Sequence, residues 1–490
     1  MTEANGATPS ARLRRIARRV MQERGLEPDF PAGALAELAR IKAPAPAGNG
    51  GLRDLRALPW CSIDNDESRD LDQLTVAEAL PQAAGRLLVA VADVDALVKR
   101  GSALDAHARK NTTSVYTAAE IFPMLPEPLS TDLTSLSFGE DRAAIVVDMT
   151  IGADGSLLQA DVFRAVVRNK AKLAYDSVAA WLEGSGPVPP AIGAVPDLAE
   201  NIQLQAGLAG RLRDRRHQQG ALVLETNQAR PVFEAGELKD LAAETRNRAR
   251  DLIEDCMIAA NGVVARFLAA RNFPVMRRIV RTPRRWDRLV ALAGTYHFAL
   301  PEEPEAKALQ GFLDAARQKD PKGFAALSLV VIKLMGRGEY VVELPGGKAQ
   351  GHFGLAVRDY AHSTAPNRRF PDLITQRLIK AALAGTAPPY PSDELAALAA
   401  HCTQEEDAAK KVERQVAKSA AAILLSPRLG QIFDVVVTAI TDHDTWISVA
   451  HPNVEGKLVE NCESCRVGDR FRAKLVHVDV ERGFIDFAKL

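Results

Sequence analysis

SIDNDESRDLDQ, residues 62–73, is the densest acidic stretch of the chain, with five carboxylates within nine positions. Repulsion between like charges makes such a cluster costly unless it is solvated or binds cations. In extended backbone Asp70 and Asp72 point to the same side, and the polar turn 65–68 can fold Asp64 back beside them. Three converging carboxylates suit Mg²⁺ or Mn²⁺, which prefer hard oxygen ligands. The stretch therefore predicts a divalent-metal site.

Calcium binding and simple solvation are the alternatives to a magnesium site in this acidic loop. In an EF-hand alignment that starts at Asp64, Arg69 stands where Gly is required and Thr75 stands where Glu is required. Both mismatches together exclude a calcium-binding EF-hand. A solvated acidic surface turn remains an open alternative on these residues alone.

Strand and helix patterns downstream of the loop predict one large α+β domain. Apolar runs at 86–94 and 142–151 are typical of buried strands, and the longer apolar pattern at 249–270 is typical of a helix. No second linker comparable to the Pro-, Ala- and Gly-rich stretch 42–51 occurs before about residue 395. We therefore expect this mixed domain to cover residues 51–395.

The C-terminal part of the chain has a different pattern. A helix dense in charge and alanine is predicted for residues 396–428, and five short strand candidates separated by turns fill residues 429–490. Five short antiparallel strands fit a small OB-type barrel, with or without a bound oligonucleotide. Cys462 and Cys465 form a lone CxxC pair, which does not complete a tetrahedral zinc site.

The N-terminal residues 1–50 are predicted to form a small helical module. Helical patterns at 12–24 and 31–41 precede the linker. A helix-turn-helix unit and a helical cap on the next domain are equally compatible with these patterns.

The composition is that of a globular protein. The chain has 490 residues, 62 Lys+Arg against 62 Asp+Glu, and 47% hydrophobic residues, which excludes a disordered or fibrous protein. No apolar run approaches the ~20 residues of a membrane span. The five cysteines are odd in number and scattered, which argues against a secreted disulfide framework. We expect a cytoplasmic monomer that does not associate with membranes.

Four blocks of the sequence resemble, in order and spacing, the ribonuclease II/ribonuclease R (RNB) family of 3′→5′ exoribonucleases. The acidic loop is similar to the family's Asp-x5-Asp-x-Asp-Asp signature. The other blocks are VADVDALVKRGSALDAHA (91–108) with TSVYTAAEIFPMLPEPLSTDLTSL (113–136), LIEDCMIAAN (252–261), and HFGLAVRDYAHSTAPNRRFPDLITQRL (352–378). The predicted barrel looks like the S1-type RNA-binding domain that usually ends these proteins.

The resemblance implies a set of metal-binding and catalytic residues. Asp64, Asp70 and Asp72 fall on the family's metal-binding carboxylates, whereas the fourth position is Gln73 instead of Asp. An amide oxygen can ligate a metal but brings no charge. The implied reaction uses Mg²⁺, or Mn²⁺, in a two-metal displacement. Asp72 and Asp70 are the catalytic carboxylates, and Arg368 takes the role of the catalytic arginine that neutralises phosphate charge.

The resemblance also implies contacts with RNA. Tyr116 falls on the family's stacking tyrosine, and the second half of that aromatic clamp falls near Leu224. Tyr175 and Glu254 match positions that contact the terminal nucleotides, where Glu254 can accept a hydrogen bond from a ribose 2′-OH. Arg369 is the second arginine of the phosphate-binding pair.

Two basic clusters are further candidates for binding a phosphate backbone. They are the arginine-rich segments 277–288, which includes Trp286 as a stacking face, and 211–216. A solvated basic face accounts for each cluster equally well.

The implied function is a processive exoribonuclease that degrades single-stranded RNA to nucleoside 5′-monophosphates. The rivals are an RNA-binding relative whose catalysis is impaired by Gln73, and a nuclease that acts mainly on DNA. Family members commonly carry two cold-shock barrels before the catalytic domain, where this sequence has a predicted helical module of about 50 residues. We therefore expect better access for structured RNA with a 3′ overhang.

Overall fold

The computed structural model describes most of the chain. The described residues are 8–46, 51–225, 229–234, 237–243, 246–321, 323–441, 444–449, 452, 454–460, 465–466 and 468–490, with the backbone alone for 229–234 and 237–243. The linker positions 47–50 and Cys462 of the CxxC pair lie outside the described residues. Among the described helices, none is long and apolar enough to cross a membrane.

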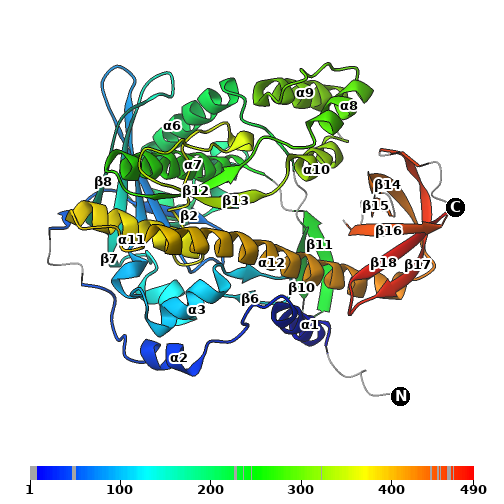
Figure 1. The fold of residues 1–490 in the computed structure, drawn as a ribbon, viewed down its shortest axis with the longest axis horizontal. Helices are drawn as coiled ribbons and strands as arrows, with labels where there is room; N and C mark the ends of the chain where they lie inside the picture. The colour runs from blue at the N-terminus through cyan, green and yellow to red at the C-terminus, as the bar shows by residue number, and fades with distance from the viewer. Residues whose placement is uncertain are drawn as a thin grey trace.

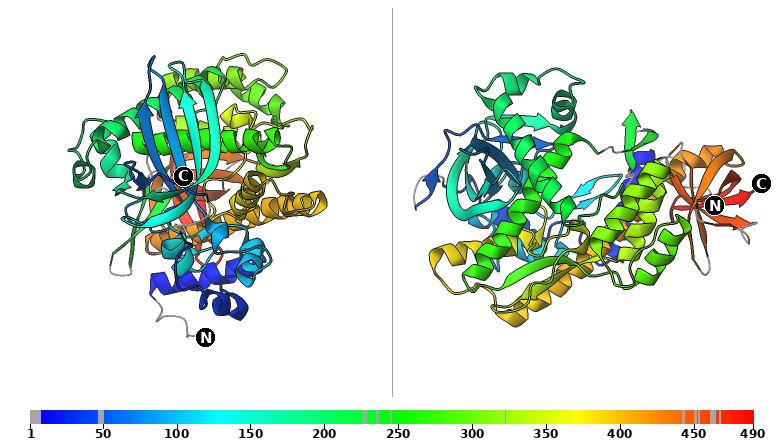
Figure 2. Two further views of the ribbon diagram at one scale, coloured as in Figure 1. Left: turned by 90° about the vertical axis from the view of Figure 1, so that its left-hand side faces the viewer. Right: turned by 90° about the horizontal axis from the view of Figure 1, so that it is seen from above.

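A seven-stranded mixed sheet lies at one end of the molecule, in the order β1-β8-β7-β4-β3-β2-β9 (Figures 1 and 2). Its strands are β1 (Arg53–Asp54), β2 (Cys61–Asp64), β3 (Gln73–Ala79), β4 (Gly85–Ala92), β7 (Asp141–Ile151), β8 (Leu157–Arg168) and β9 (Ala171–Ala174). The central strand β4 is buried at every position except Arg86, which explains its nearly continuous apolar sequence. The strands predicted at 86–94 and 142–151 are confirmed as β4 and β7.

Two long helices pack against this sheet. α7 (Arg248–Ala270) contacts β2, β4, β7 and β8, and α6 (Leu198–Gln218) contacts α7, β3 and β4. Fourteen of the 23 residues of α7 are buried, as expected for a helix that is apolar on most of its sides. The helix predicted at 249–270 is therefore confirmed. The short helices α4 (Tyr175–Leu182) and α5 (Pro190–Gly193) pack beside β9.

Two further helices link the sheet to the C-terminal part of the chain. α11 (Phe370–Ala384) packs on α7 and on the 3₁₀ turn η1 (Val94–Ala96), and the 34-residue α12 (Ser392–Leu425) runs from the sheet domain to the barrel (Figure 1). Leu395 and Leu398 of α12 belong to the core of the sheet domain, whereas Val416 and Leu425 belong to the core that includes the barrel. α12 therefore fixes the barrel to the rest of the molecule.

The C-terminal barrel is closed. Its strands pair in the order β14-β15-β16-β18-β17. They are β14 (Ile432–Ile440), β15 (Thr445–Val449), β16 (Val454–Glu460), β17 (Arg470–Asp479) and β18 (Phe484–Lys489). The predicted five-stranded OB-type barrel is confirmed.

The N-terminal helices do not form a separate unit. α1 (Pro9–Glu23) packs on α12 and buries Leu13 and Ile16 in the core that includes the barrel. α2 (Ala32–Leu38) packs on α3 (Ala103–Asn111) and buries Ala34 in the core of the sheet domain. Since a helix-turn-helix unit pairs its two helices with one another, the structure favours the helical cap.

The remaining elements are a hairpin that packs on α12, a helical lobe and two further strand pairs. The hairpin consists of β5 (Val115–Tyr116) and β6 (Ile121–Phe122). The lobe has its own apolar core and consists of α8 (Trp286–Thr295), α9 (Ala306–Lys319) and α10 (Phe324–Met335). Two more strand pairs are β10 (Ala229–Glu234) with β11 (Glu237–Ala243) and β12 (Val275–Val280) with β13 (Gly338–Glu343).

Candidate active site

The acidic loop joins two neighbouring strands of the sheet. Asp64 ends β2 and Gln73 begins β3, and the antiparallel pairing of these strands places both residues at one end of the sheet. Between them, the N–H of Leu71 donates to Ser135 Oγ at 3.0 Å, and the Leu71 side chain is buried. The loop is thus anchored in its middle, and residues 65–72 make no strand pairs.

A cavity of about 1320 Å³ opens beside this loop. Eight of the ten predicted site residues line it: Asp64, Asp70, Gln73, Tyr116, Tyr175, Glu254, Arg368 and Arg369. They come from distant parts of the sequence, so the fold itself assembles the site. Asp72 and Trp286 are not on its wall.

Asp72 lies behind the cavity wall, against the turn that precedes α11. It is 3% exposed, and its Oδ1 accepts the backbone N–H of Asn367 at 2.9 Å while Oδ2 pairs with Arg368 Nε at 3.2 Å. Burial raises the pKa of Asp72 to about 7. Asp64 and Asp70 thus line the cavity directly, whereas Asp72 is buried against Arg368, which lines it. The metal-binding role expected for Asp72 stays a prediction.

The carboxylates of the acidic loop that line the cavity are Asp64 and Asp70, and the amide of Gln73 lines it beside them. Burial raises the pKa of Asp70, and the neighbouring Asp64 charge adds to that shift. Gln73 Nε2 donates to the backbone carbonyl of Thr364 at 2.7 Å, which leaves Oε1 as its ligating atom. Two carboxylates and an amide oxygen suit a hard divalent cation that keeps several waters. In the described part of the chain, no three His, Cys, Asp or Glu side chains are grouped to hold a metal.

The two arginines before α11 have different surroundings. Arg368 pairs with Asp72 and lines the cavity with its side chain 39% exposed. Arg369 also lines the cavity, but its Nη2 donates to the buried Asp372 at 2.8 Å. Arg368 is thus the arginine better placed to meet a phosphate, which agrees with the catalytic role expected for it.

Tyr116 stands on the β5–β6 hairpin with 42% of its surface exposed. Its side chain lies beside Asp70, and its backbone N–H donates to Glu413 of α12 at 2.9 Å. The hairpin is therefore tied to α12 while much of the Tyr116 side chain stays accessible. Leu224, expected near the second half of a clamp, also lines the cavity, next to Val223.

The predicted contacts to the terminal nucleotides lie on the α4 and α7 side of the cavity. Arg250 lies over the ring of Tyr175, 4.7 Å from its centroid, and donates to Asn65 Oδ1 at 2.9 Å. Glu254 is exposed and forms an ion pair with Arg246 at 3.4 Å. An RNA ribose would have to share Glu254 with that arginine.

Trp286 is not a stacking face for RNA. It is 5% exposed in the core of the helical lobe, and its indole N–H donates to the carbonyl of Pro301 at 2.8 Å. Its only polar side-chain atom is therefore paired inside the lobe, as is usual for a buried Trp.

The basic segment 277–288 is likewise only partly available to a phosphate backbone. Arg277 is 1% exposed and pairs with Glu343 and Asp359, and Arg278 is 8% exposed and pairs with Glu406. A sequence count of charges could not detect these buried ion pairs, because their acidic partners lie up to about 130 residues away.

The structure adds residues on the cavity wall and directly behind it that the motifs did not identify. Thr364 and Asn367 act through backbone atoms, for which sequence gives no signal beyond their place in the Asn-Arg-Arg block. Arg213 and His217 of the basic cluster 211–216 and its flank line the cavity, together with Arg246. Burial lowers the pKa of His217, and the charges of Arg216 and Arg213 lower it further. The guanidinium groups of this wall are paired with carboxylates, Arg213 with Asp251 and Arg246 with Asp251 and Glu254.

Two family models match the chain. The RNB domain matches residues 52–385, and the RNase II-type exonuclease C-terminal S1 domain matches residues 431–490. The first covers the sheet, α7, α11 and every cavity residue from Asp64 to Arg369, and the second covers the barrel.

The relatives agree with these matches. The chain is 30% identical to ribonuclease R of Thermotoga maritima over 89% of this chain and 64% of that protein. It is 36% identical to exoribonuclease 2 of Escherichia fergusonii over 70% of this chain and 52% of that protein. The apo ribonuclease R of Mycoplasma genitalium superposes with a TM-score of 0.87 at 20% identity, over 99% of this chain and 79% of that one. That protein has also been solved with single-stranded and with double-stranded RNA. The chain thus spans less than two thirds of the two curated relatives.

Proposed function

The chain belongs to the RNB-domain family with an RNase II-type C-terminal S1 domain, and on this premise we propose that it is a processive 3′→5′ exoribonuclease acting on single-stranded RNA. One observation carries the proposal: a single cavity holds oxygen donors for a divalent cation, a guanidinium for a phosphate and an aromatic ring for a base. The products are nucleoside 5′-monophosphates and a short end fragment.

The metal in this proposal is Mg²⁺, with Mn²⁺ as the alternative. Asp64, Asp70 and the Oε1 atom of Gln73 would hold it. When bound, the cation supplies Lewis-acid polarisation of the phosphodiester and acidifies bound water.

The protein's own groups bind and orient the RNA. Arg368 neutralises charge on the scissile phosphate, and Asp72 fixes the orientation of that guanidinium from behind. Tyr116 offers a face for the terminal base, a contact that tolerates any sequence. Glu254 distinguishes RNA from DNA by accepting a hydrogen bond from the 2′-OH.

A time course on 5′-labelled single-stranded RNA with Mg²⁺ tests the proposal, with DNA of the same sequence alongside. We expect the label to pass from full length directly to a fragment of a few nucleotides, on RNA alone. A hairpin with a 3′ overhang tests the second substrate class, which the duplex-bound Mycoplasma relative supports. Distributive shortening, or equal cleavage of DNA, would contradict the proposed activity.

Tyr116→Ala is expected to raise the KM for single-stranded RNA about 5- to 150-fold, because one base–aromatic stack contributes about 1–3 kcal/mol. Steady-state kinetics on a short oligonucleotide measure the change. Tyr116→Phe is the matched control, since it keeps the ring and removes only the hydroxyl that contacts Asp70. Leu224→Phe should lower the KM by enlarging the apolar wall. An unchanged KM in Tyr116→Ala would remove the stacking role.

The second candidate function is an RNA-binding relative in which Gln73 has ended catalysis. Binding of RNA without cleavage under both Mg²⁺ and Mn²⁺ would establish it. The retained Asp72–Arg368 pair favours the enzyme. We also propose a cytoplasmic location, because the cysteines of the described residues are free thiols, which suits a reducing compartment.

A further inference from the structure

We infer that the cavity holds one divalent cation in the RNA-free protein, and that Gln73 sets this number. The inference rests on the proposed metal site, and it departs from the two-metal centre that the sequence motif implies. It follows from the charge at the cavity, the orientation of one amide and the position of Asp72.

The charge beside the acidic loop matches one divalent cation. Asp64 and Asp70 form no ion pair within 4.0 Å among the described residues, whereas Asp72 is paired with Arg368 at 3.2 Å. With Asp64, Asp70 and Asp72 all ionised, the three carboxylates and the guanidinium of Arg368 sum to a charge of −2 (three negative, one positive). One divalent cation neutralises this group. A second would leave an excess of +2 in a partly buried site, which is unfavourable until an anionic substrate arrives.

The side chain of Gln73 is held in a way that an aspartate cannot copy. Its Nε2 donates to the Thr364 carbonyl at 2.7 Å and so ties β3 to the turn that carries Arg368. A carboxylate has no donor for this bond. Where the family motif has an aspartate, Gln73 therefore carries no negative charge and forms a structural hydrogen bond instead. Its amide oxygen is a neutral ligand at the cavity wall.

Asp72 is not on the cavity wall, so a cation in the cavity lacks this third carboxylate of the loop as a direct neighbour. Both of its oxygens already accept hydrogen bonds, from the N–H of Asn367 and from Arg368 Nε. Only Asp64 and Asp70 remain as carboxylates of the acidic loop on the cavity wall next to Gln73. Two carboxylates and one amide oxygen, completed by water, make a ligand set for a single hard cation.

A titration of the intact protein with Mn²⁺, without RNA, tests the inference. Equilibrium dialysis and the EPR signal of free Mn²⁺ give the number of bound ions and their affinities. We expect one ion per chain for the wild type and two for Gln73→Asp, which adds the missing charge. Gln73→Glu adds the same charge on a side chain of the original length, so it serves if the aspartate variant folds poorly.

Two control variants locate the effect. Asp70→Asn should lower the Mn²⁺ affinity at least about tenfold, because it removes half of the charged ligands. Asp66→Asn changes the same charge at an exposed position of the same loop and should leave one ion bound. Two ions of similar affinity in the wild type would overturn the inference. A wild type that binds no ion would also overturn it. So would an unchanged number and affinity of bound ions in both Gln73→Asp and Gln73→Glu.

The outcome is separable from the proposed function, because the titration contains no RNA. A wild type that holds one ion but leaves RNA intact would refute the exoribonuclease and keep the inference. A wild type that cleaves RNA but holds two ions would support the exoribonuclease and refute the inference.

Discussion

Asp72→Asn is expected to lower the rate of RNA cleavage by about a thousandfold or more and to leave the affinity for RNA within about twofold. The carboxylate of Asp72 accepts one hydrogen bond from Asn367 N–H and one from Arg368 Nε. An asparagine presents an NH₂ group to one of these two donors, so one contact becomes donor against donor. Arg368 then loses its fixed orientation toward the scissile phosphate. RNA binding survives because Asp72 does not line the cavity.

Single-turnover cleavage of 5′-labelled RNA gives the rate, and fluorescence anisotropy gives the affinity. Asp66→Asn is the matched control, because it makes the same chemical change at an exposed position of the same loop and should cleave at the wild-type rate. An equal loss of binding and cleavage in Asp72→Asn would show that the residue supports the site as a whole, and not the reaction.

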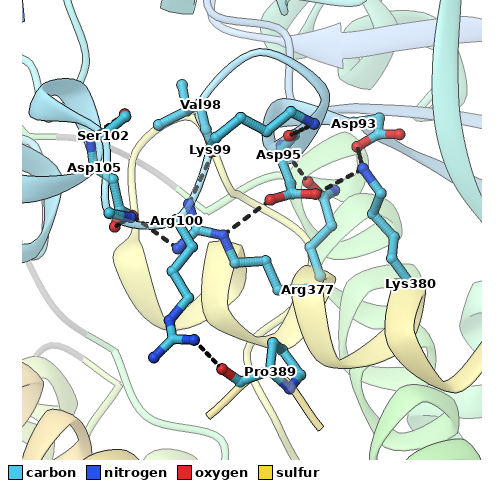
Figure 3. Close-up of polar contacts among 12 residues, drawn as sticks. Asp93, Asp95, Val98, Lys99, Arg100, Ser102, Asp105, Arg377, Lys380 and Pro389 are labelled. Atoms are coloured by element: carbon cyan, nitrogen blue, oxygen red, sulfur yellow. Dashed lines mark hydrogen bonds and ion pairs between the residues drawn. The ribbon is translucent and has the colours of Figure 1, made fainter. Parts of the chain in front are cut away.

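Arg377→Met is expected to lower the free energy of unfolding by about 3–5 kcal/mol, the usual cost of leaving buried charges without their partner. Arg377 lies on α11 with 3% of its side chain exposed, and pairs with Asp95 at 3.0 Å and Asp105 at 2.7 Å. Figure 3 shows these residues together with Lys380 and Asp93 of the same network. Methionine has a similar volume but no charge, so both carboxylates lose their guanidinium partner.

Urea unfolding followed by circular dichroism measures the change. The control is Lys99→Met, which removes a positive charge at an exposed position beside the same network and should change stability by less than about 0.5 kcal/mol. A loss below about 1 kcal/mol in Arg377→Met would show that Lys380, which pairs with Asp93 and Asp95, is sufficient to compensate the carboxylates.

The same network joins elements that lie next in sequence to residues of the candidate active site. It fastens α11 to the η1 turn and to the start of α3, which precedes the hairpin that carries Tyr116. Arg368 lies just before α11 in sequence, so the network lies next to segments that carry two residues of the cavity wall. A destabilised variant is therefore expected to lose activity at a lower temperature than the wild type.

Much of the fold could be predicted because it depends on local pattern. Continuous apolar runs identified β4 and β7 as buried strands, and five short alternating segments identified the barrel. The motif blocks also contain seven of the eight predicted site residues that line the cavity, all but Tyr175. Residue type and spacing carry this information, because periodicity of burial is a property of neighbouring positions.

Other features could not be predicted, because they depend on which distant segments meet. Trp286 and Arg277 have the side chains of an RNA-binding surface, yet both are buried by partners that no local pattern identifies. The helices α1 and α2 have ordinary amphipathic patterns, and only the packed structure shows that they join two different cores.

The acidic loop, the arginine pair and the neutral residue at position 73 could all be identified from the order of the amino acids. That Asp72 is buried against Arg368, and that Gln73 donates a hydrogen bond to Thr364, became visible only in the folded chain. The physical reason is that a side chain in irregular backbone takes its direction from its hydrogen-bond partners. For Asp72 those partners lie almost 300 residues further along the chain.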